Sequence, residues 1–217
     1  MSYLSDFSLE IDAGAEQGAV IVGIDEVGRG PLAGPVMAAA VHIPFALHAD
    51  PLLRDVTDSK QLNATKRELI AGALLGLVPY GIGVAEVEEI DRINILQATY
   101  VAMARAAAAL SDRLDKEPDL YLIDGNRLPP SPAPARAVVK GDLKSLSIAA
   151  ASIIAKVHRD NAMRVLADAH PGYGWERNAG YGTAEHLAGI AAHGVTDHHR
   201  RSFRPVREAL LAGGGTL

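Results

Sequence analysis

The sequence predicts an α/β protein in which helices flank one central, mixed five-stranded sheet, with a short helical extension at the C-terminus. Five short runs rich in apolar and β-branched residues indicate strands. Stretches in which apolar residues recur with a helical repeat lie between and after these runs. No internal repeat divides the chain into similar parts. This order of elements is typical of a domain that buries a single sheet under helices.

The composition indicates a folded, soluble chain. Of its 217 residues, 48% are hydrophobic and 22% are charged, which excludes a disordered protein. A membrane-spanning helix needs about 20 consecutive apolar residues, and the best candidate, residues 101–110, contains Arg105. Residues 1–20 carry several acids and no Lys or Arg, which is the wrong charge for a secretory or transit signal. We therefore expect a cytoplasmic protein.

The predicted strands are short apolar runs bounded by glycine, proline or polar residues. The first run, Ala-Val-Ile-Val-Gly-Ile, has the composition of a buried strand. In chain order, the predicted strands are residues 19–24, 36–43, 81–87, 120–123 and 137–139.

The predicted helices are marked by capping residues or by a helical repeat. Asn63 is a suitable N-cap for a helix over residues 64–75, and Thr65 with Glu68 offers an alternative capping box. Further helices are predicted over residues 94–110, 147–166, 184–193 and 205–211.

The chemistry concentrates where the first predicted strand ends. Residues 23–36 read Gly-Ile-Asp-Glu-Val-Gly-Arg-Gly-Pro-Leu-Ala-Gly-Pro-Val. Two of these glycines have the spacing of a phosphate-binding loop, but the Lys and the Ser or Thr that such a loop requires are missing. What remains is two adjacent carboxylates, Asp25 and Glu26, beside a glycine turn that lets a ligand approach the backbone. On this segment alone, both acids could also be exposed turn residues paired with Arg29.

Two further acids follow predicted strands in the same way. Asp124 follows the run Leu-Tyr-Leu-Ile, and Asp142 follows the run Val-Val-Lys-Gly. Adjacent buried carboxylates are costly unless a cation compensates their charge. Hard divalent cations such as Mg²⁺ and Mn²⁺ bind a few carboxylate oxygens and keep waters that substrate can replace. The sequence, which has no cysteine, therefore predicts an oxygen-ligand metal site formed by Asp25, Glu26, Asp124 and Asp142.

Side-chain alternation along the strand creates a difficulty for Glu26. Consecutive strand residues point to opposite faces of a sheet, so Asp25 and Glu26 cannot both face one site from regular β geometry. Either a bend at the strand end or a contribution from the Glu26 carbonyl is required.

Two other groups of residues have more than one interpretation. The formal net charge is −5, yet residues 198–207 contain four arginines, which could form a solvated face or contact phosphates. A zinc site is disfavoured for the C-terminal histidines, because no second ligand lies at i+4 on a helix and two arginines are adjacent. These histidines are His186, His193, His198 and His199.

Tyr173 and Trp175 are expected to form a packed turn rather than a base-stacking platform.

Six ordered motifs resemble those of the bacterial ribonuclease HII family, over about residues 19–210. The resemblance implies a ribonuclease H-like fold. We expect a loose leader over 1–18, a catalytic domain over 19–190 and a C-terminal helical segment over 191–217 packed on it. It implies an endonuclease that cuts RNA in RNA–DNA hybrids and at single ribonucleotides embedded in duplex DNA. The motifs are residues 23–36, Asp-Ser-Lys at 58–60, Ile-Asp-Gly-Asn at 123–126, Val-Lys-Gly-Asp at 139–142, Ala-Ala-Ala-Ser-Ile-Ile-Ala-Lys-Val at 149–157 and Gly-Tyr-Gly-Thr at 180–183.

The resemblance also implies roles for individual residues. The four carboxylates would be catalytic and hold two Mg²⁺ or Mn²⁺ ions that activate water and stabilise the leaving 3′-oxygen, which gives 3′-hydroxyl and 5′-phosphate ends. Backbone groups of Gly28, Arg29 and Gly30 would detect the ribose 2′-hydroxyl. Tyr181 would stack at the RNA–DNA junction, and Lys60 would contact a backbone phosphate.

Some positions depart from the family pattern. Asn178 and Ala179 stand where relatives commonly have His-Lys, so we expect a basic contact near Tyr181 to be missing. Gln61 stands where a further lysine is common. Residues 211–217 contain no sliding-clamp motif, and we expect a monomer without a membrane partner.

Other functions remain as alternatives. Another metal-dependent nuclease of the same fold, such as a junction resolvase, is the alternative enzyme. A hybrid-binding module without turnover is disfavoured, because a binder has no reason to keep carboxylates that repel phosphate.

Overall fold

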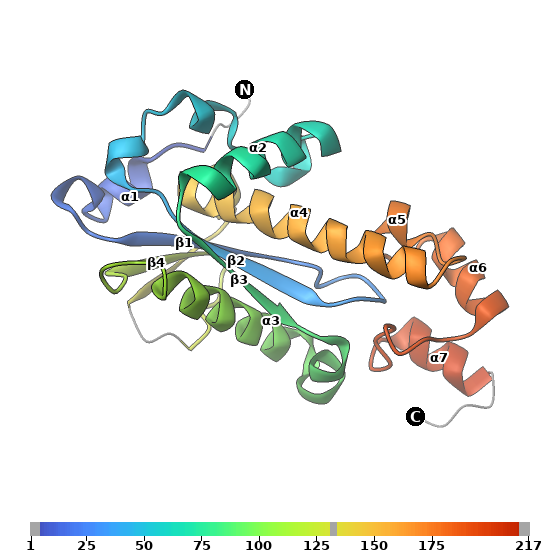
Figure 1. Cartoon of the computed structure of the whole chain (residues 1–217). Helices are drawn as coiled ribbons and strands as arrows, with labels where there is room; N and C mark the ends of the chain where they lie inside the picture. Colours follow the sequence, from blue (N-terminus) through green and yellow to red (C-terminus); the bar gives the residue numbers. More distant parts are fainter. Residues whose placement is uncertain (1–4, 131–133, 213–217) are drawn as a thin grey trace. The chain divides into compact units, whose positions relative to one another are not determined.

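The computed structural model describes residues 5–130 and 134–212 and contains the predicted five-stranded sheet (Figure 1). The strand order is β3-β2-β1-β4-β5. β1 is antiparallel to β2 and parallel to β4, and β4 is parallel to β5, so the prediction of a mixed sheet is confirmed. The strands are β1 (Ile21–Val27), β2 (Val36–His42), β3 (Tyr80–Ala85), β4 (Leu120–Asp124) and β5 (Ala135–Val138).

The predicted helices are present, with ends shifted by a few residues. The side chain of Asn63 accepts a hydrogen bond from the amide of Lys66, which confirms it as the N-cap of the first long helix. Two short helices, α1 and α5, were not predicted. The helices are α1 (Ser8–Asp12), α2 (Ala64–Leu77), α3 (Val87–Ser111), α4 (Leu146–Ala169), α5 (Trp175–Asn178), α6 (Ala184–His193) and α7 (Arg204–Ala212).

The chain divides into two compact units, and α3 and α4 each contribute to both. The first, called the sheet unit here, comprises Met1–Val27, Met37–Val84 and Tyr100–Val157. The second, called the helical unit, comprises Gly28–Val36, Ala85–Thr99 and His158–Leu217.

Within the sheet unit, helices cover both faces of the sheet. α2 and the first half of α4 pack on one face, and the second half of α3 packs on the other (Figure 1). The helix α4 approaches closely at Gly23 of β1, because a Cβ atom there would collide with the backbone of Ser147. Similarly, α3 approaches β3 closely at Gly83, because a Cβ atom there would collide with the carbonyl of Ala102.

The helix α3 is long and apolar enough, by length and composition alone, to cross a membrane. However, it is interrupted at Asn94, whose φ of 68° is not helical. The Asn94 carboxamide then accepts hydrogen bonds from the amides of Leu96 and Gln97 and starts the second segment. That segment buries Ala102, Ala106 and Leu110 completely, as expected of a core helix in a folded domain.

Residues 5–18, the described part of the segment expected to be a loose leader, belong to the sheet unit and pack within it. Phe7 joins its hydrophobic core. Glu10 is completely buried, and its Oε1 accepts hydrogen bonds from Ser145 Oγ at 2.6 Å and from the Ser147 amide at 2.9 Å. Glu10 therefore satisfies a donor at the start of α4, a contact between residues too far apart in sequence to be recognised from a local pattern.

Burial raises the pKa of the Glu10 carboxyl, although the hydrogen bonds from Ser145 and Ser147 oppose the shift. The folded protein therefore binds this proton more tightly than the unfolded chain does. The stabilising contribution of Glu10 is fully present below the ordinary pKa of glutamate and is lost as pH rises through the raised pKa.

We expect Glu10→Gln to melt at the same temperature as the wild type or higher at pH 7, and to lose this advantage as pH falls toward about 4. The glutamine can still accept both hydrogen bonds but carries no buried charge. Thermal melts followed by circular dichroism at a series of pH values measure the difference between the two proteins. Glu16→Gln, at an exposed position, is the control and should show little difference. A lower melting temperature of Glu10→Gln at pH 7 would contradict the prediction.

Candidate active site

Three of the predicted carboxylates lie on, or shortly after, three neighbouring parallel strands. Ile24 of β1 pairs with Ile123 of β4, so Asp25 and Asp124 occupy equivalent positions at the same edge of the sheet. Asp142 lies in the short 3₁₀ helix Gly141–Leu143, which follows β5. Because β1, β4 and β5 run parallel, all three residues lie toward the carboxyl ends of neighbouring strands: Asp25 just beyond the part of β1 that pairs with β4, Asp124 at the end of β4 and Asp142 after β5.

Asp25 is the most buried member of this group, with 6% of its surface exposed. Its Oδ1 accepts a hydrogen bond from the Glu26 amide at 2.8 Å, and its carboxylate also accepts one from Ser152 on α4. Burial raises the pKa of Asp25 well above its ordinary value, and the negative charges of Glu26 and Asp124 raise it further. The protein thus holds a carboxylate where its charge is poorly compensated by protein groups.

Glu26 lies on a regular stretch of strand. The antiparallel register continues through Glu26↔Ala38 and Val27↔Met37, so no bend of β1 turns the Glu26 side chain toward the face of Asp25. Regular alternation along a strand would direct the two side chains to opposite faces of the sheet. Of the two ways in which Glu26 could reach a shared site, the bend is therefore not observed. The charge of Glu26 nevertheless raises the pKa of Asp25 more than that of Asp124 does.

Asp124 and Asp142 are held by protein groups close to them. The amide of Gly141 donates to Asp124 Oδ1 at 2.6 Å, which ties the end of β4 to the turn after β5. Asp142 Oδ2 lies 3.7 Å from Lys60 Nζ, and its side chain also hydrogen-bonds to Asp58. Partial burial raises the pKa of Asp142, as do the charges of Asp124 and Asp58, while Lys60 lowers it.

Lys60 faces this acidic group, although most of its side chain is exposed. Burial alone would lower the pKa of Lys60. However, the attraction of four carboxylates outweighs burial, so its pKa is raised, and Lys60 is a persistent positive charge beside the acids. These carboxylates are Asp58, Asp142, Asp25 and Asp124.

The donor chemistry of this group fits a hard divalent cation. Its members offer carboxylate oxygens, and the raised pKa of Asp25 indicates negative charge that a cation would compensate. Within the described ranges, no three Asp, Glu or His side chains are already gathered closely enough to count as a ready-made ligand set.

The glycine-rich loop that follows β1 belongs to the helical unit and is held by two buried arginines. Arg200 donates to the carbonyls of Gly28 at 2.6 Å, Arg29 at 3.1 Å and Gly34 at 2.8 Å. Arg159 donates to the carbonyls of Ala33, Pro35 and Ala179. Burial lowers the pKa of Arg159 to about 10 and that of Arg200 to about 9, so both guanidinium groups remain charged at neutral pH.

Tyr181 lies against this loop and is 47% exposed. A Cβ atom on Gly30 would be 3.3 Å from Tyr181 Cε1, so the glycine leaves room for the ring. The amide of Leu32 donates to the carbonyl of Gly180 at 2.7 Å. The structure thus brings together Tyr181 and the Gly28-Arg29-Gly30 segment, which the sequence analysis assigned to substrate binding.

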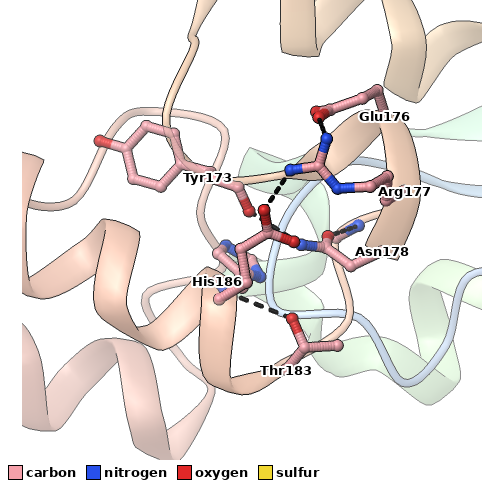
Figure 2. A network of polar contacts seen from close by, with 8 residues as sticks. Tyr173, Glu176, Arg177, Asn178, Thr183 and His186 are labelled. Atoms are coloured by element: carbon pink, nitrogen blue, oxygen red, sulfur yellow. Dashed lines mark hydrogen bonds and ion pairs between the residues drawn. The ribbon is translucent and has the colours of Figure 1, made fainter.

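The helical unit contains other residues for which the sequence predicted a position or a contact. Tyr173 and Trp175 are buried and stacked, as the packed-turn interpretation predicts. Asn178, at the position of the expected basic residue, bridges the turn by donating to the Tyr173 carbonyl and accepting from the Gly180 amide (Figure 2). Arg200 is neither solvated nor free to contact phosphate, because it is completely buried.

The sequence predicts no role for Asp58, Ser152 or Arg159, and it does not predict the contacts of Arg200 with the loop carbonyls. Ser152 is a lone polar residue in the apolar stretch of α4, which was a usable signal. The arginines were not recognisable, because their carbonyl partners lie 20 to 172 positions away in the sequence.

Comparison with known proteins gives one consistent result. The family model described as Ribonuclease HII matches residues 22–206. The ribonuclease HII of Rhodospirillum rubrum is 61% identical over 210 residues, which are 95% of this chain and 92% of that protein.

Two solved structures are similar to this chain in fold. The crystal structure of ribonuclease H2 from Pyrococcus horikoshii has a TM-score of 0.71 and 26% identity, and the match covers 90% of this chain and 99% of that one. A Bst-RNase HIII crystallised in complex with Mn²⁺ also has a TM-score of 0.71, with 24% identity, 91% of this chain and 72% of that one covered.

We expect Arg200→Lys to lower the free energy of unfolding by at least about 2 kcal/mol, because one ammonium group cannot reach three carbonyls and each buried carbonyl left unpaired costs about 1–3 kcal/mol. Urea unfolding monitored by circular dichroism measures the loss. Arg204→Lys, at an exposed position on α7, is the matched control and should change stability by less than about 0.5 kcal/mol. Equal stability of the two variants would show that the Arg200 hydrogen bonds are not important for the fold.

Proposed function

This chain belongs to the ribonuclease HII family, and we propose that it hydrolyses the RNA strand of RNA–DNA hybrids and incises duplex DNA at single embedded ribonucleotides. The observation that carries this proposal is the group of carboxylates at three neighbouring parallel strand ends, with Asp25 buried and its charge poorly compensated. We also propose that the protein acts as a monomer in the cytoplasm. The residues from Gly213 onward lie outside the described part of the structure, and the expectation that the chain does not bind a sliding clamp stays a prediction.

The carboxylates Asp25, Asp124 and Asp142 would hold Mg²⁺ or Mn²⁺. Glu26 would contribute through its backbone carbonyl, because regular alternation along β1 would direct its side chain to the opposite face. Two such ions, when bound, supply positive charge that activates water and stabilises the departing 3′-oxygen. Hydrogen bonds from neighbouring protein groups would hold these carboxylates in place. Ser152 and the Glu26 amide fix the orientation of Asp25, and the Gly141 amide fixes that of Asp124.

Substrate selection would depend on the loop after β1. In a trans peptide, the carbonyl of one residue and the amide of the next point in opposite directions. Since Arg200 draws the carbonyls of Gly28 and Arg29 inward, the amides of Arg29 and Gly30 point away from it. Amides presented in this way can hydrogen-bond a ribose 2′-hydroxyl, the group that distinguishes RNA from DNA.

Two side chains would complete the contact with nucleic acid. The half-exposed ring of Tyr181 would stack on the sugar and base at the RNA–DNA junction. Lys60, exposed and positively charged, would contact a backbone phosphate and offset the repulsion between that phosphate and the carboxylates.

We expect Asp124→Asn to reduce Mg²⁺-dependent cleavage by at least about 100-fold, the scale of losing one strong electrostatic group in an active site. Hybrid binding should be largely retained, because asparagine can still accept the Gly141 hydrogen bond. Cleavage of a duplex with one embedded ribonucleotide, with and without Mg²⁺, tests this. Asp115→Asn, an exposed acid of the same unit, is the control and should keep full activity.

Analysis of the ends tests the reaction itself. Attack by water with departure of the 3′-oxygen leaves a 3′-hydroxyl and a 5′-phosphate. A 2′,3′-cyclic phosphate, or full activity of Asp124→Asn, would contradict the proposed function.

We expect Tyr181→Ala to slow cleavage at a single ribonucleotide by roughly 5- to 150-fold, because a stacking contact is worth about 1–3 kcal/mol. Tyr181→Phe keeps the ring and should retain most of the activity. Single-turnover rates on the single-ribonucleotide duplex and on a long hybrid, together with a melting curve, measure the effect. Equal losses on both substrates accompanied by a lower melting temperature would mean that Tyr181 is needed for folding rather than for recognition.

A further inference from the structure

A buried chain of aromatic side chains lies beneath the turn that carries Tyr181. Trp175, His186 and His199 are almost completely buried. The indole Nε1 of Trp175 donates to His186 Nε2 at 2.9 Å, and the Nε2 atoms of His186 and His199 are 3.1 Å apart. At the other side of its ring, His186 Nδ1 lies 3.0 Å from the carbonyl oxygen of Tyr181.

The proton positions in this chain follow from the indole, which can only donate. His186 Nε2 must therefore accept, and the proton of the neutral ring is on Nδ1, which donates to the Tyr181 carbonyl. His199 Nδ1 accepts from the Thr196 amide at 3.0 Å, so the proton of His199 is on Nε2 and is directed at His186. Every ring nitrogen is used in this arrangement, which leaves no lone pair for a metal ion.

Burial keeps both rings neutral. It lowers the pKa of His199 to about 3, with further lowering from His186, and it also lowers the pKa of His186. A proton added to His186 Nε2 would point at two N–H donors, the indole of Trp175 and Nε2 of His199. Neither ring can therefore serve as an acid or base toward substrate, and their completely buried position excludes direct contact with it.

The carbonyl of Tyr181 is fixed by hydrogen bonds from two sides. It accepts from the Thr183 amide at 2.8 Å and from His186 at 3.0 Å. Thr183 in turn caps α6, because its hydroxyl accepts from the His186 amide (Figure 2). His186 is thus the side chain through which the buried cluster holds the backbone of the residue that carries the exposed ring.

We infer that His186 is a positioning residue for the recognition step: its Nδ1 hydrogen bond to the Tyr181 carbonyl sets the orientation in which the Tyr181 ring meets the substrate. This inference rests on the proposed function, because the role of Tyr181 is part of that proposal. The indole of Trp175 sets the tautomer of His186, and His199 supports the ring from the opposite side.

Two substitutions distinguish the hydrogen bond at Nδ1 of His186 from the one at its Nε2. The carboxamide of His186→Asn can place a donor near the position of Nδ1 and keep the Tyr181 contact, while it loses the acceptor for Trp175. The longer side chain of His186→Gln can place an acceptor near the position of Nε2 and satisfy Trp175, while it loses the donor to Tyr181. His193→Gln is the control, since His193 is on the same helix and is exposed.

We expect His186→Gln to slow single-turnover cleavage of the single-ribonucleotide duplex by roughly 2- to 13-fold, the value of one hydrogen bond. His186→Asn should retain more activity than His186→Gln although it melts at a lower temperature. His193→Gln should match the wild type. Activity that simply follows melting temperature across the three variants would overturn the inference in favour of a purely structural role.

A double-mutant cycle tests whether His186 acts through Tyr181. In the Tyr181→Ala background, which has no ring to position, His186→Gln should cause less than about a 2-fold further loss. The same fold loss in both backgrounds would overturn the inference.

Amide hydrogen exchange provides a readout independent of catalysis. We expect the amides of Tyr181 and Thr183 to exchange faster in His186→Gln than in the wild type or in His193→Gln. Unchanged exchange would overturn the inference. If Tyr181→Ala cleaves normally, the proposed role of Tyr181 fails, and the exchange measurement alone decides whether His186 fixes this turn.

Discussion

The parallel pairing of β1 with β4 and of β4 with β5 is the constraint on which the candidate active site depends. It places the carboxyl ends of three strands at one edge of the sheet, so residues distant in sequence become neighbours. The acids at these ends repel one another, and burial increases the cost for Asp25. The fold can tolerate this cost because extensive packing elsewhere, on both faces of the sheet, stabilises the strands that carry the acids.

The two units satisfy buried charge in opposite ways. In the sheet unit, carboxylates receive hydrogen bonds from amides and from Ser152, and Lys60 lies beside them. In the helical unit, the guanidinium groups of Arg159 and Arg200 are surrounded by backbone carbonyls. The proposed cation would bind the acidic group, whereas the carbonyl contacts of the arginines use their donors to shape a loop. We associate the first with chemistry and the second with recognition.

The elements of the fold could be predicted because each strand and each long helix has a local pattern, such as the Asn63 cap of α2. The strand-end acids could be found for the same reason, since their positions relative to the apolar runs are visible in the sequence. Contacts such as those of Glu10 with Ser145 and of Arg200 with Gly28 could not. A buried charged residue looks like a surface residue in sequence until tertiary structure supplies its partners.

The position of Trp175 has a spectroscopic consequence. It is the chain's single tryptophan, it is almost fully buried, and its indole N–H is bonded to His186. Intrinsic tryptophan fluorescence therefore reports on the helical unit alone, whereas circular dichroism reports on helices and strands throughout the chain. Comparing the two signals during unfolding distinguishes a protein whose units melt together from one whose units melt in separate steps, without any label.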